Sequence, residues 1–214
     1  MTMGERNTRL KRRTNAPDAL RGRILDAAAQ AFQSRGYNAT SMHEIMRASR
    51  ATGGATYHHF PTKKALGVAV IRERVAKAID ALWLERMRLA DSTLDGVLTV
   101  FAETIAAMEH RQVVAGCEVS NLALELALAD DDFRVALQVV FDRWRDGIAD
   151  RIRADQTSGA LDEDDADDLA TFIVASYSGA MAIAKASQDS APLKACALQL
   201  ARVLSRRRPT VRRS

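Results

Sequence analysis

The chain of 214 residues contains little cysteine, proline or aromatic residue, and it has no long apolar run. Its two cysteines, Cys117 and Cys196, are too few for the disulfide framework of a small secreted protein. The first residues are mostly polar and basic, unlike an export leader. The longest uncharged stretch, residues 171–184, has 14 residues, whereas a helix needs about 20 mostly apolar residues to cross a bilayer. We therefore expect a cytoplasmic protein without a membrane partner.

Catalytic, cofactor and metal motifs are also missing from the sequence. No paired acid and base and no glycine-rich phosphate loop stands out, so the sequence predicts neither an enzyme nor a bound cofactor. His58 and His59 are adjacent, and adjacent side chains on a helix point about 100° apart. No Asp, Glu, Cys or third histidine lies three or four residues away, so we expect no metal site.

Alanine and leucine are abundant, and apolar residues do not alternate with polar ones. This composition is typical of helices, so the predicted fold class is all-α. At 214 residues, the chain is long enough for one large domain or two small ones with a sizeable core.

Charge is divided unevenly along the chain. Residues 1–77 contain 15 Lys and Arg against 5 Asp and Glu, whereas residues 78–201 contain 10 against 22. The run from Arg202 to Ser214 adds six arginines and no acid. A basic segment neutralises nucleic-acid phosphates with release of counterions, and an acidic companion disfavours docking the wrong way round. The division predicts that the N-terminal part binds DNA.

Two short predicted helices lie within the basic part. Thr40 or Ser41 can cap the first, and Ser41 with Glu44 matches a capping box. Thr52 can cap the second, which ends before Pro61 because proline disfavours the helical conformation in the preceding residue. Two short helices joined by a tight turn are typical of a helix-turn-helix, whose second helix enters the DNA major groove.

The residues around this motif resemble the TetR family of bacterial transcriptional regulators, closely over residues 21–68. The matching segments are the amphipathic helix Arg23 to Arg35, the junction Gly36-Tyr37-Asn38-Ala39-Thr40-Ser41 and the block Tyr57-His58-His59-Phe60-Pro61-Thr62-Lys63-Lys64-Ala65-Leu66. Further along, the segment GCEVSNLALEL from Gly116 loosely resembles one C-terminal subgroup. The resemblance implies an N-terminal three-helix head with the helix-turn-helix, followed by a larger helical domain for ligand binding and dimerisation.

The residues expected to contact DNA lie in the second helix and at the edges of the motif. They are Thr40, Ser41, Arg50, Thr52, Gly53, Gly54, Ala55, Tyr57, His58, His59 and Lys63. By resemblance, Tyr57 and Lys63 contact phosphate, and Thr40 contributes from the start of the preceding helix. The glycine pair indicates close approach of the backbone, either to DNA or to the first helix of the head. Phe60 is expected in the core.

Residues 1–16 are polar and basic and are expected to be disordered when free. Two interpretations stay open: an arm that follows the phosphate backbone or enters the minor groove, and a solvated tail. The first helix is expected to begin at Pro17 and to end at Gly36, a natural left-handed cap. Arg21 or Arg23 can lie near phosphate from this helix.

Helical periodicity continues to the end of the chain. It predicts helices over residues 63–90, 92–109, 118–128 and 131–154, another after the acidic cluster 162–168, and a last one over 191–204. By family analogy, the helix over 131–154 and the helix that follows pair with their symmetry mates in a four-helix dimer interface. The expected domains are a basic arm with the DNA-binding domain at 1–66, a ligand-sensing and dimerisation domain at 67–207, and a basic tail at 208–214.

Large apolar residues, and polar residues on apolar faces, are the candidates for an effector pocket. They are Trp83, Met87, Phe101, Met108, Cys117, Asn121, Trp144, Ile148, Tyr177 and Met181. Each of them fits plain core as well. For Cys117, a redox or electrophile sensor and a buried small hydrophobe both stay open, and the second is the commoner role.

The sequence thus predicts a sequence-specific transcriptional regulator that binds double-stranded DNA as a homodimer. We expect a repressor that a small hydrophobic effector releases from a palindromic operator. A regulator without a ligand, or an activator, is the alternative, because the sign of regulation depends on where the operator lies. A helical enzyme or scaffold that merely contains a helix-turn-helix is the remaining alternative, and no sequence motif supports it.

Overall fold

The computed structural model describes residues 3–163 and 165–206, and within them every regular element is a helix. In chain order the elements are α1 (Met3–Arg35), α2 (Met42–Ser49), α3 (Gly53–His59), α4 (Lys63–Val70), η1 (Ile71–Val75), α5 (Ala76–Ile79), η2 (Asp80–Leu84), α6 (Glu85–Leu89), α7 (Thr93–Arg111), α8 (Glu118–Leu126), α9 (Asp131–Thr157), α10 (Ala166–Ser187) and α11 (Ala191–Arg206). The predicted all-α fold is confirmed. The predicted tail, residues 208–214, lies outside the described residues.

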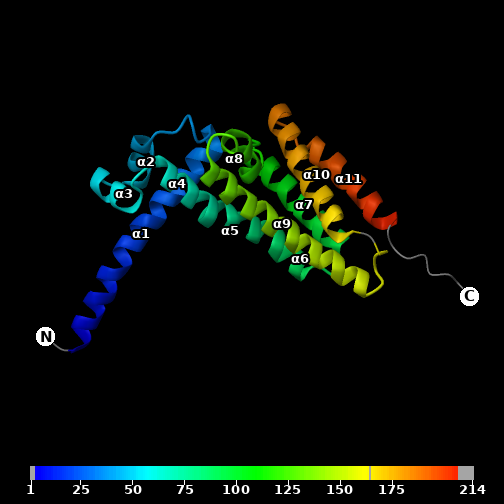
Figure 1. The fold of residues 1–214 in the computed structure, drawn as a ribbon, viewed down its shortest axis with the longest axis horizontal. Helices are drawn as coiled ribbons and strands as arrows, with labels where there is room; N and C mark the ends of the chain where they lie inside the picture. Colours follow the sequence, from blue (N-terminus) through cyan, green and yellow to red (C-terminus); the bar gives the residue numbers. More distant parts are fainter. Residues whose placement is uncertain (1–2, 164, 207–214) are drawn as a thin grey trace, which may run out of the picture.

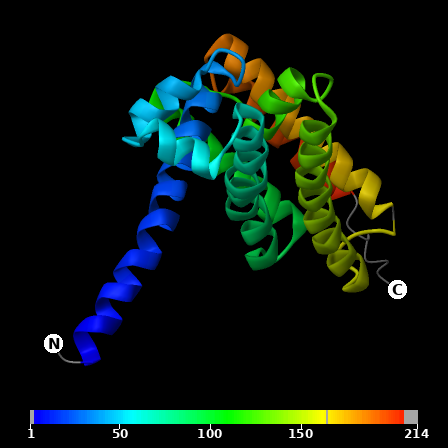
Figure 2. The same cartoon turned by 60° about the vertical axis from the view of Figure 1, so that its left-hand side comes forward.

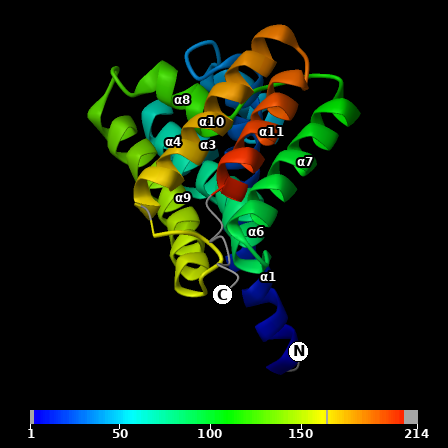
Figure 3. The same ribbon diagram turned by 90° about the vertical axis from the view of Figure 1, so that its right-hand side faces the viewer.

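The helices form two parts, which Figure 1 shows in one view. We call α1, α2 and α3 the head, and the helices from α4 to α11 the body. α2 and α3 lie at one end of the molecule, and α1 extends away from the other helices toward its N-terminus (Figures 1 and 2). Within the body, α9 packs against the run from α4 to α6 and against α10. α10 and α11 lie side by side on the side opposite the head (Figure 3).

Helix α1 begins at Met3 rather than at Pro17, so the expected disorder of residues 1–16 is wrong for the described backbone. The stretch contains four arginines, one lysine, one leucine and one glutamate, which are residues of high helix propensity. The helix ends at Arg35. Gly36 follows with a φ of 90°, which confirms its prediction as a left-handed cap.

The run from Lys63 to Leu89 joins the head to the body without a break between its helical elements, as predicted. It contains two wider π-helical turns, η1 and η2, with α5 between them. η1 packs against both α1 and α9, so the same stretch touches the head and the centre of the body. A movement of the body end of this run therefore reaches the head directly.

One apolar core fills the body and continues into the head. At its centre lie the rings of Trp83, Phe101, Trp144 and Tyr177, which are at most 2% exposed. The Trp83 ring centroid is 5.3 Å from that of Trp144 and 5.0 Å from that of Tyr177. The four rings come from η2, α7, α9 and α10. Because such rings bury large apolar areas, we call them the ring cluster and regard it as the main contact among these elements.

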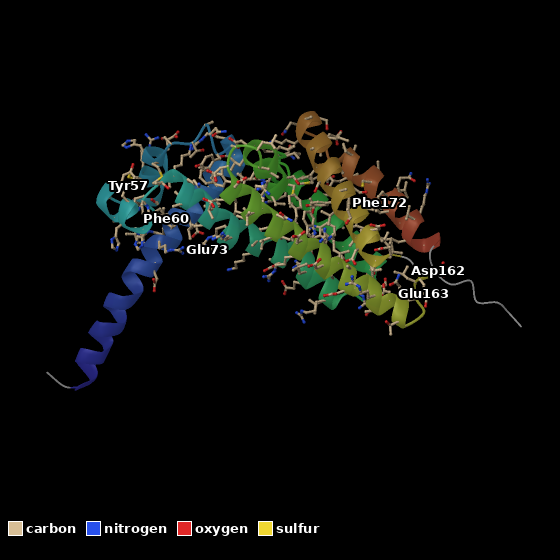
Figure 4. All side chains as sticks on the ribbon, in the orientation of Figure 1. Tyr57, Phe60, Glu73, Asp162, Glu163 and Phe172 are labelled. Atoms are coloured by element: carbon tan, nitrogen blue, oxygen red, sulfur yellow. The ribbon has the colours of Figure 1, made fainter. Side chains whose placement is uncertain are left out.

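The body exposes a face of apolar side chains on α10 and α11. Phe172 and Ile183 on α10 are 47% and 60% exposed, and Leu198 on α11 is 53% exposed (Figure 4 labels Phe172). The exposed side of α9 carries two valines among ion pairs within the helix, such as Arg153 with Asp150. The family analogy assigns the dimer interface to α9 and α10, and this stays a prediction, while the open apolar face lies on α10 and α11.

By length and composition, α10 is apolar enough to cross a membrane, with a mean hydropathy of 1.4. The fold gives its apolar character another cause. One side of α10 packs on α9, another packs on α11, and the remaining side belongs to the exposed apolar face. A helix that is covered on several sides is expected to be apolar around much of its circumference.

Candidate DNA interface and effector pocket

Helix α2 begins at the capping box that the sequence predicts. The Ser41 Oγ accepts a hydrogen bond from the Glu44 N–H at 3.2 Å, and the Glu44 carboxylate accepts one from the Ser41 N–H at 2.7 Å. The backbone N–H of Ser41, followed by its hydroxyl, lowers the pKa of the Glu44 carboxyl. The box satisfies amides that a helix start leaves unpaired and fixes the point where the chain enters α2.

The turn between α2 and α3 depends on the backbone of Arg50. This residue is left-handed, with φ 54° and ψ 38°, and its N–H donates to the carbonyls of Arg47 and Met46. Thr52 follows, and its hydroxyl oxygen accepts the Ala55 N–H at 3.3 Å to start α3. The left-handed residue makes the turn tight enough to bring the two short helices together, as the helix-turn-helix prediction requires.

Most of the predicted DNA contacts are accessible on the head. Ser41, Arg50, Thr52, Gly53, Gly54, Tyr57 and His58 are exposed, and Ala55, His59 and Lys63 are half-buried. The Tyr57 side chain is 49% exposed and lies at the outer end of the head (Figure 4). The ring centroids of His58 and His59 are 5.5 Å apart. No group of three potential metal ligands occurs in the part of the chain that the structure describes.

Thr40 is the exception among the predicted contacts. Its side chain is only 1% exposed, and its hydroxyl donates to the Gly36 carbonyl at 2.8 Å. The predicted contact of this side chain with DNA is therefore wrong, because the hydroxyl is used inside the turn before α2. His43 and Arg47, which the prediction does not include, are exposed on α2 on the side opposite the buried Ile45.

Gly53 and Gly54 begin α3 without crowding from the rest of the chain. A Cβ built on Gly53 meets the Met46 sulfur at 3.8 Å, and one on Gly54 has no described atom within 4 Å. The first helix of the head is therefore excluded as the reason for close backbone approach. Close approach of the glycine pair to DNA stays a prediction.

Lys63 lies against the turn between α1 and α2. Its Nζ is 4.3 Å from the centre of the Tyr37 ring and donates to the Asn38 carbonyl at 3.4 Å. Burial lowers the pKa of the Lys63 ammonium group. Contact with the ring face holds the cation at the edge of the motif, at the position where the resemblance expects a phosphate contact.

An ion pair fixes α1 to the run that joins head and body. The Arg21 guanidinium donates to both carboxylate oxygens of Glu73, and it lies 5.2 Å from the centre of the Phe60 ring. Phe60 is 3% exposed, which confirms it as core; Figure 4 labels both Phe60 and Glu73. Arg21 is thus engaged inside the chain, and the exposed Arg23 also donates to the Ser49 carbonyl at 3.5 Å, so a phosphate contact of either residue stays a prediction.

Comparison with known proteins identifies both parts of the chain. Residues 24–70 match the bacterial regulatory proteins of the tetR family, and residues 93–199 match the C-terminal domain of LmrA/YxaF-like transcriptional regulators. The chain belongs to the TetR family. The transcriptional regulator AcuR of Cereibacter sphaeroides is 32% identical, over 83% of this chain and 83% of its own length. The HTH-type regulator YxaF of Bacillus subtilis is 26% identical, over 84% of this chain and 92% of its own length.

Solved structures of TetR-family regulators have the same fold. The regulatory protein TetR from Rhodobacter sphaeroides aligns with a TM-score of 0.76 and 27% identity, covering 85% of this chain and 96% of that one. A TetR transcriptional regulator from Chloroflexus aurantiacus aligns with a TM-score of 0.78 and 25% identity, covering 90% and 98%. The chain is thus a TetR-family transcriptional regulator and not an enzyme, as predicted.

In this TetR-family regulator, nine of the ten predicted pocket residues are buried in the body. Besides the ring cluster, they are the buried side chains of Met87, Met108, Cys117, Ile148 and Met181. The hydroxyls of Tyr177 and Thr104 share a hydrogen bond at 3.2 Å. The indole N–H groups of Trp83 and Trp144 are buried and have no hydrogen-bond partner among the described residues. An unpaired buried donor is energetically costly.

Asn121 lies away from the ring cluster, where the head meets the body. Its amide nitrogen donates to the Ala115 carbonyl at 2.8 Å and to the Gln33 side chain at 3.3 Å. It borders a hollow of about 400 Å³ that Gln33, Glu125 and Lys185 also line. Asn121 therefore contacts the head, and among the predicted pocket residues its backbone N–H donates to the Cys117 carbonyl at 2.8 Å.

Cys117 is 6% exposed, and burial raises the pKa of its thiol. The thiolate is the reactive form of cysteine, so burial disfavours a role as sensor. Of the two interpretations of Cys117, the structure favours the buried small hydrophobe.

Proposed function

We propose that this chain is a cytoplasmic, homodimeric repressor that binds a palindromic operator and is released from it by a small hydrophobic effector. The observation that carries this proposal is the capped α2–α3 pair, which exposes Gly53, Gly54, Tyr57 and His58 at the outer end of the head. We assign DNA binding to residues 1–66, effector binding and dimerisation to residues 67–207, and a supporting basic tail to residues 208–214.

The apolar face on α10 and α11 supports the homodimer. Phe172, Ile183 and Leu198 would each be covered by a second copy, which removes apolar surface from water. A two-fold axis through this face duplicates the head. Two heads related by a two-fold axis fit two half-sites about one helical turn apart, or a multiple of it, which is why we propose a palindromic operator.

The ring cluster supports the effector site. It combines apolar rings with the two unpaired indole N–H groups of Trp83 and Trp144, so an apolar effector that carries a hydrogen-bond acceptor suits it. The core of the body also contains Met87, Met108 and Met181, whose flexible side chains can adapt to a bound effector. An effector lowers operator affinity only by its differential affinity for the DNA-competent and DNA-incompetent arrangements of the heads.

The sign of regulation is proposed from a relative. The HTH-type transcriptional repressor DhaR of Mycobacterium sp. is 27% identical over 81% of this chain and 86% of its own length. Repression fits a protein whose operator overlaps a promoter. If the selected operator lies upstream of the promoter and transcription falls when the chain is removed, the activator alternative replaces repression.

Selection of bound fragments from the source genome tests DNA recognition. We expect one family of sites with inverted symmetry, a large preference over bulk DNA, and affinity that falls steeply with salt as counterions are released. The double variant Tyr57→Ala, Lys63→Ala removes two expected phosphate contacts, so it should bind both its best site and bulk DNA more weakly while its melting temperature stays close to that of the wild type. Unchanged affinity of the double variant for its best site would sink the proposal.

Intrinsic fluorescence tests the effector site, because Trp83 and Trp144 are the chain's two tryptophans and both belong to the ring cluster. A screen of small apolar compounds should yield one that changes this fluorescence, raises the melting temperature and weakens operator binding over the same concentration range. A compound that binds without weakening operator binding supports the alternative of a regulator that does not respond to a ligand.

A further inference from the structure

The turn between α1 and α2 is held by a residue from the body. The Glu125 carboxylate on α8 accepts the Tyr37 N–H at 2.9 Å and the Asn38 N–H at 2.6 Å. These partners are 88 and 87 residues away in the sequence. Both amides lie between the two helices, outside any helical ladder, and hydrogen bonds to a carboxylate are stronger than those between neutral groups.

Gly36 leaves room for the Glu125 carboxylate, and the Tyr37 ring packs against both the head and the body. Gly36 has a φ of 90°, and a Cβ built on it would lie 3.1 Å from the nearer carboxylate oxygen of Glu125. The Tyr37 ring packs between Phe32 of α1 and Phe133 of α9, with centroid distances of 5.1 Å to each. The turn is thus fixed to the body by a carboxylate on one side and by a ring on the other.

Helix α8 also touches α10 on the same side. Asn121 lies four residues before Glu125, so the two side chains share one face of the helix. The Lys185 ammonium on α10 donates to the Asn121 side-chain oxygen at 3.3 Å, and the Asn121 amide donates to Gln33 of α1 at 3.3 Å. One face of α8 therefore connects α10, which carries the exposed apolar face, with two points of the head.

We propose that Glu125 is a positioning residue, which sets the orientation of α2 and α3 relative to α10 and α11. This inference rests on the proposed function, in which α10 and α11 pair two copies and each head takes one half-site. Without the carboxylate, the amides of Tyr37 and Asn38 lose their acceptor, and the head samples more orientations. Both heads must then be ordered when the dimer binds two half-sites, and that entropy cost lowers affinity.

Hydrogen exchange in the free full-length protein gives the first test. In Glu125→Ala, peptides that contain Tyr37 and Asn38 should exchange at the rate of unstructured chain, while the ring cluster keeps its protection. Glu125→Gln keeps one acceptor oxygen and should give an intermediate rate. Glu103→Gln is the control, because Glu103 is also a hydrogen-bonded glutamate of the body but is exposed and paired with Arg86 on the surface. It should exchange like the wild type.

DNA binding gives the second test, with the genome-selected operator and a duplex that carries one half-site. Glu125→Ala should bind the full operator about tenfold more weakly, a change of about 1.4 kcal/mol, and the half-site duplex as the wild type does. Equal losses on both duplexes would mean that Glu125 merely stabilises the head, and would overturn the inference. Unchanged exchange at Tyr37 and Asn38 would overturn it as well.

The two tests separate this inference from the proposed function. If the wild type shows no preference for any DNA site, the proposed function fails, while hydrogen exchange still decides whether Glu125 holds the turn. If the melting temperature of Glu125→Ala falls steeply, Glu125→Gln decides the matter, because it is nearly isosteric with glutamate. A Glu125→Gln protein with wild-type exchange and wild-type operator affinity contradicts the role.

Discussion

The head and the body each contain a tyrosine of interest, and the two differ in how far they are exposed to solvent. Tyr57 on α3 is 49% exposed, whereas Tyr177 on α10 is 2% exposed and its hydroxyl bonds to Thr104. Burial raises the pKa of the Tyr177 hydroxyl, while Tyr57 stays open to solvent or a partner. The head therefore exposes the side chains expected to contact DNA, whereas the body buries the side chains expected to contact an effector. Mutations in the head should separate DNA binding from stability. Mutations in the ring cluster of the body should change effector binding and stability together.

The largest effect should come from the ring cluster of the body. Trp83→Ala removes a fully buried ring that contacts Phe101, Trp144 and Tyr177, and it should lower the free energy of unfolding by about 3–5 kcal/mol. Urea denaturation followed by circular dichroism measures it. Trp83→Phe keeps much of the ring and removes an unpaired N–H donor, so it should cost clearly less. A Trp83→Ala variant as stable as the wild type would show that the cluster contributes little.

The next effect should come from the outer face of the body. Charge introduced by Leu198→Glu would be buried twice in a two-fold interface, so the protein should become monomeric at micromolar concentration. Loss of the second head should weaken operator binding by about a hundredfold or more. Val139→Glu is the matched control, since Val139 is 59% exposed but lies on the charged side of α9. Sedimentation measures both variants; a monomer from Val139→Glu alone would return the interface to α9.

A smaller effect should separate binding from stability in the head. Tyr57→Phe removes an exposed hydroxyl and should change the free energy of unfolding by less than about 0.5 kcal/mol. It should lower affinity about tenfold for operator and bulk DNA alike, because a phosphate contact carries no sequence information. Tyr177→Phe should do the reverse, with a stability loss of about 1 kcal/mol and unchanged DNA affinity. A loss restricted to one operator sequence would make Tyr57 a base contact instead.

Local signals made much of the head predictable from the sequence. The capping box of Ser41 and Glu44, the Thr52 cap and the end of α3 before Pro61 each depend on residues within four positions of one another. The family resemblance over residues 21–68 came from the same stretch. The prediction for Thr40 did not foresee that its hydroxyl donates to the carbonyl of Gly36, only four residues away. The left-handed backbone of Gly36 turns this carbonyl toward the hydroxyl. Residue type alone does not reveal such an acceptor.

Long-range contacts were not predictable in the same way. The assignment of α9 and α10 to the dimer interface had to come from family analogy, because periodicity shows that a helix has an apolar face and not what covers it. In this fold the run from Lys63 to Leu89 and α10 cover α9, which leaves the apolar face of α11 open. Glu125 was missed for the same reason, since its partners Tyr37 and Asn38 are distant in the sequence and use backbone amides.

The smallest effect should lie on the border between the two parts, at the Arg21–Glu73 ion pair. Both side chains are more than a third exposed, so solvent screening limits the pair to about 0.2–1 kcal/mol. Hydrogen bonds from Arg21 lower the pKa of the Glu73 carboxyl below 4.5, against the opposing effect of burial. A carboxyl with a lowered pKa stabilises the fold above its unfolded pKa, and this contribution disappears as pH falls through the folded value.

A double-mutant cycle of Arg21→Gln and Glu73→Gln isolates that pair from the rest of the fold. Urea denaturation at pH 7 should give a coupling free energy of up to about 1 kcal/mol, which shrinks with added salt and vanishes well below pH 4.5. Operator affinity should change little, because Glu125 and Tyr37 still hold the head to the body. A coupling that is equal at pH 7 and pH 3 would mean that the two side chains interact through packing around Phe60 rather than through charge.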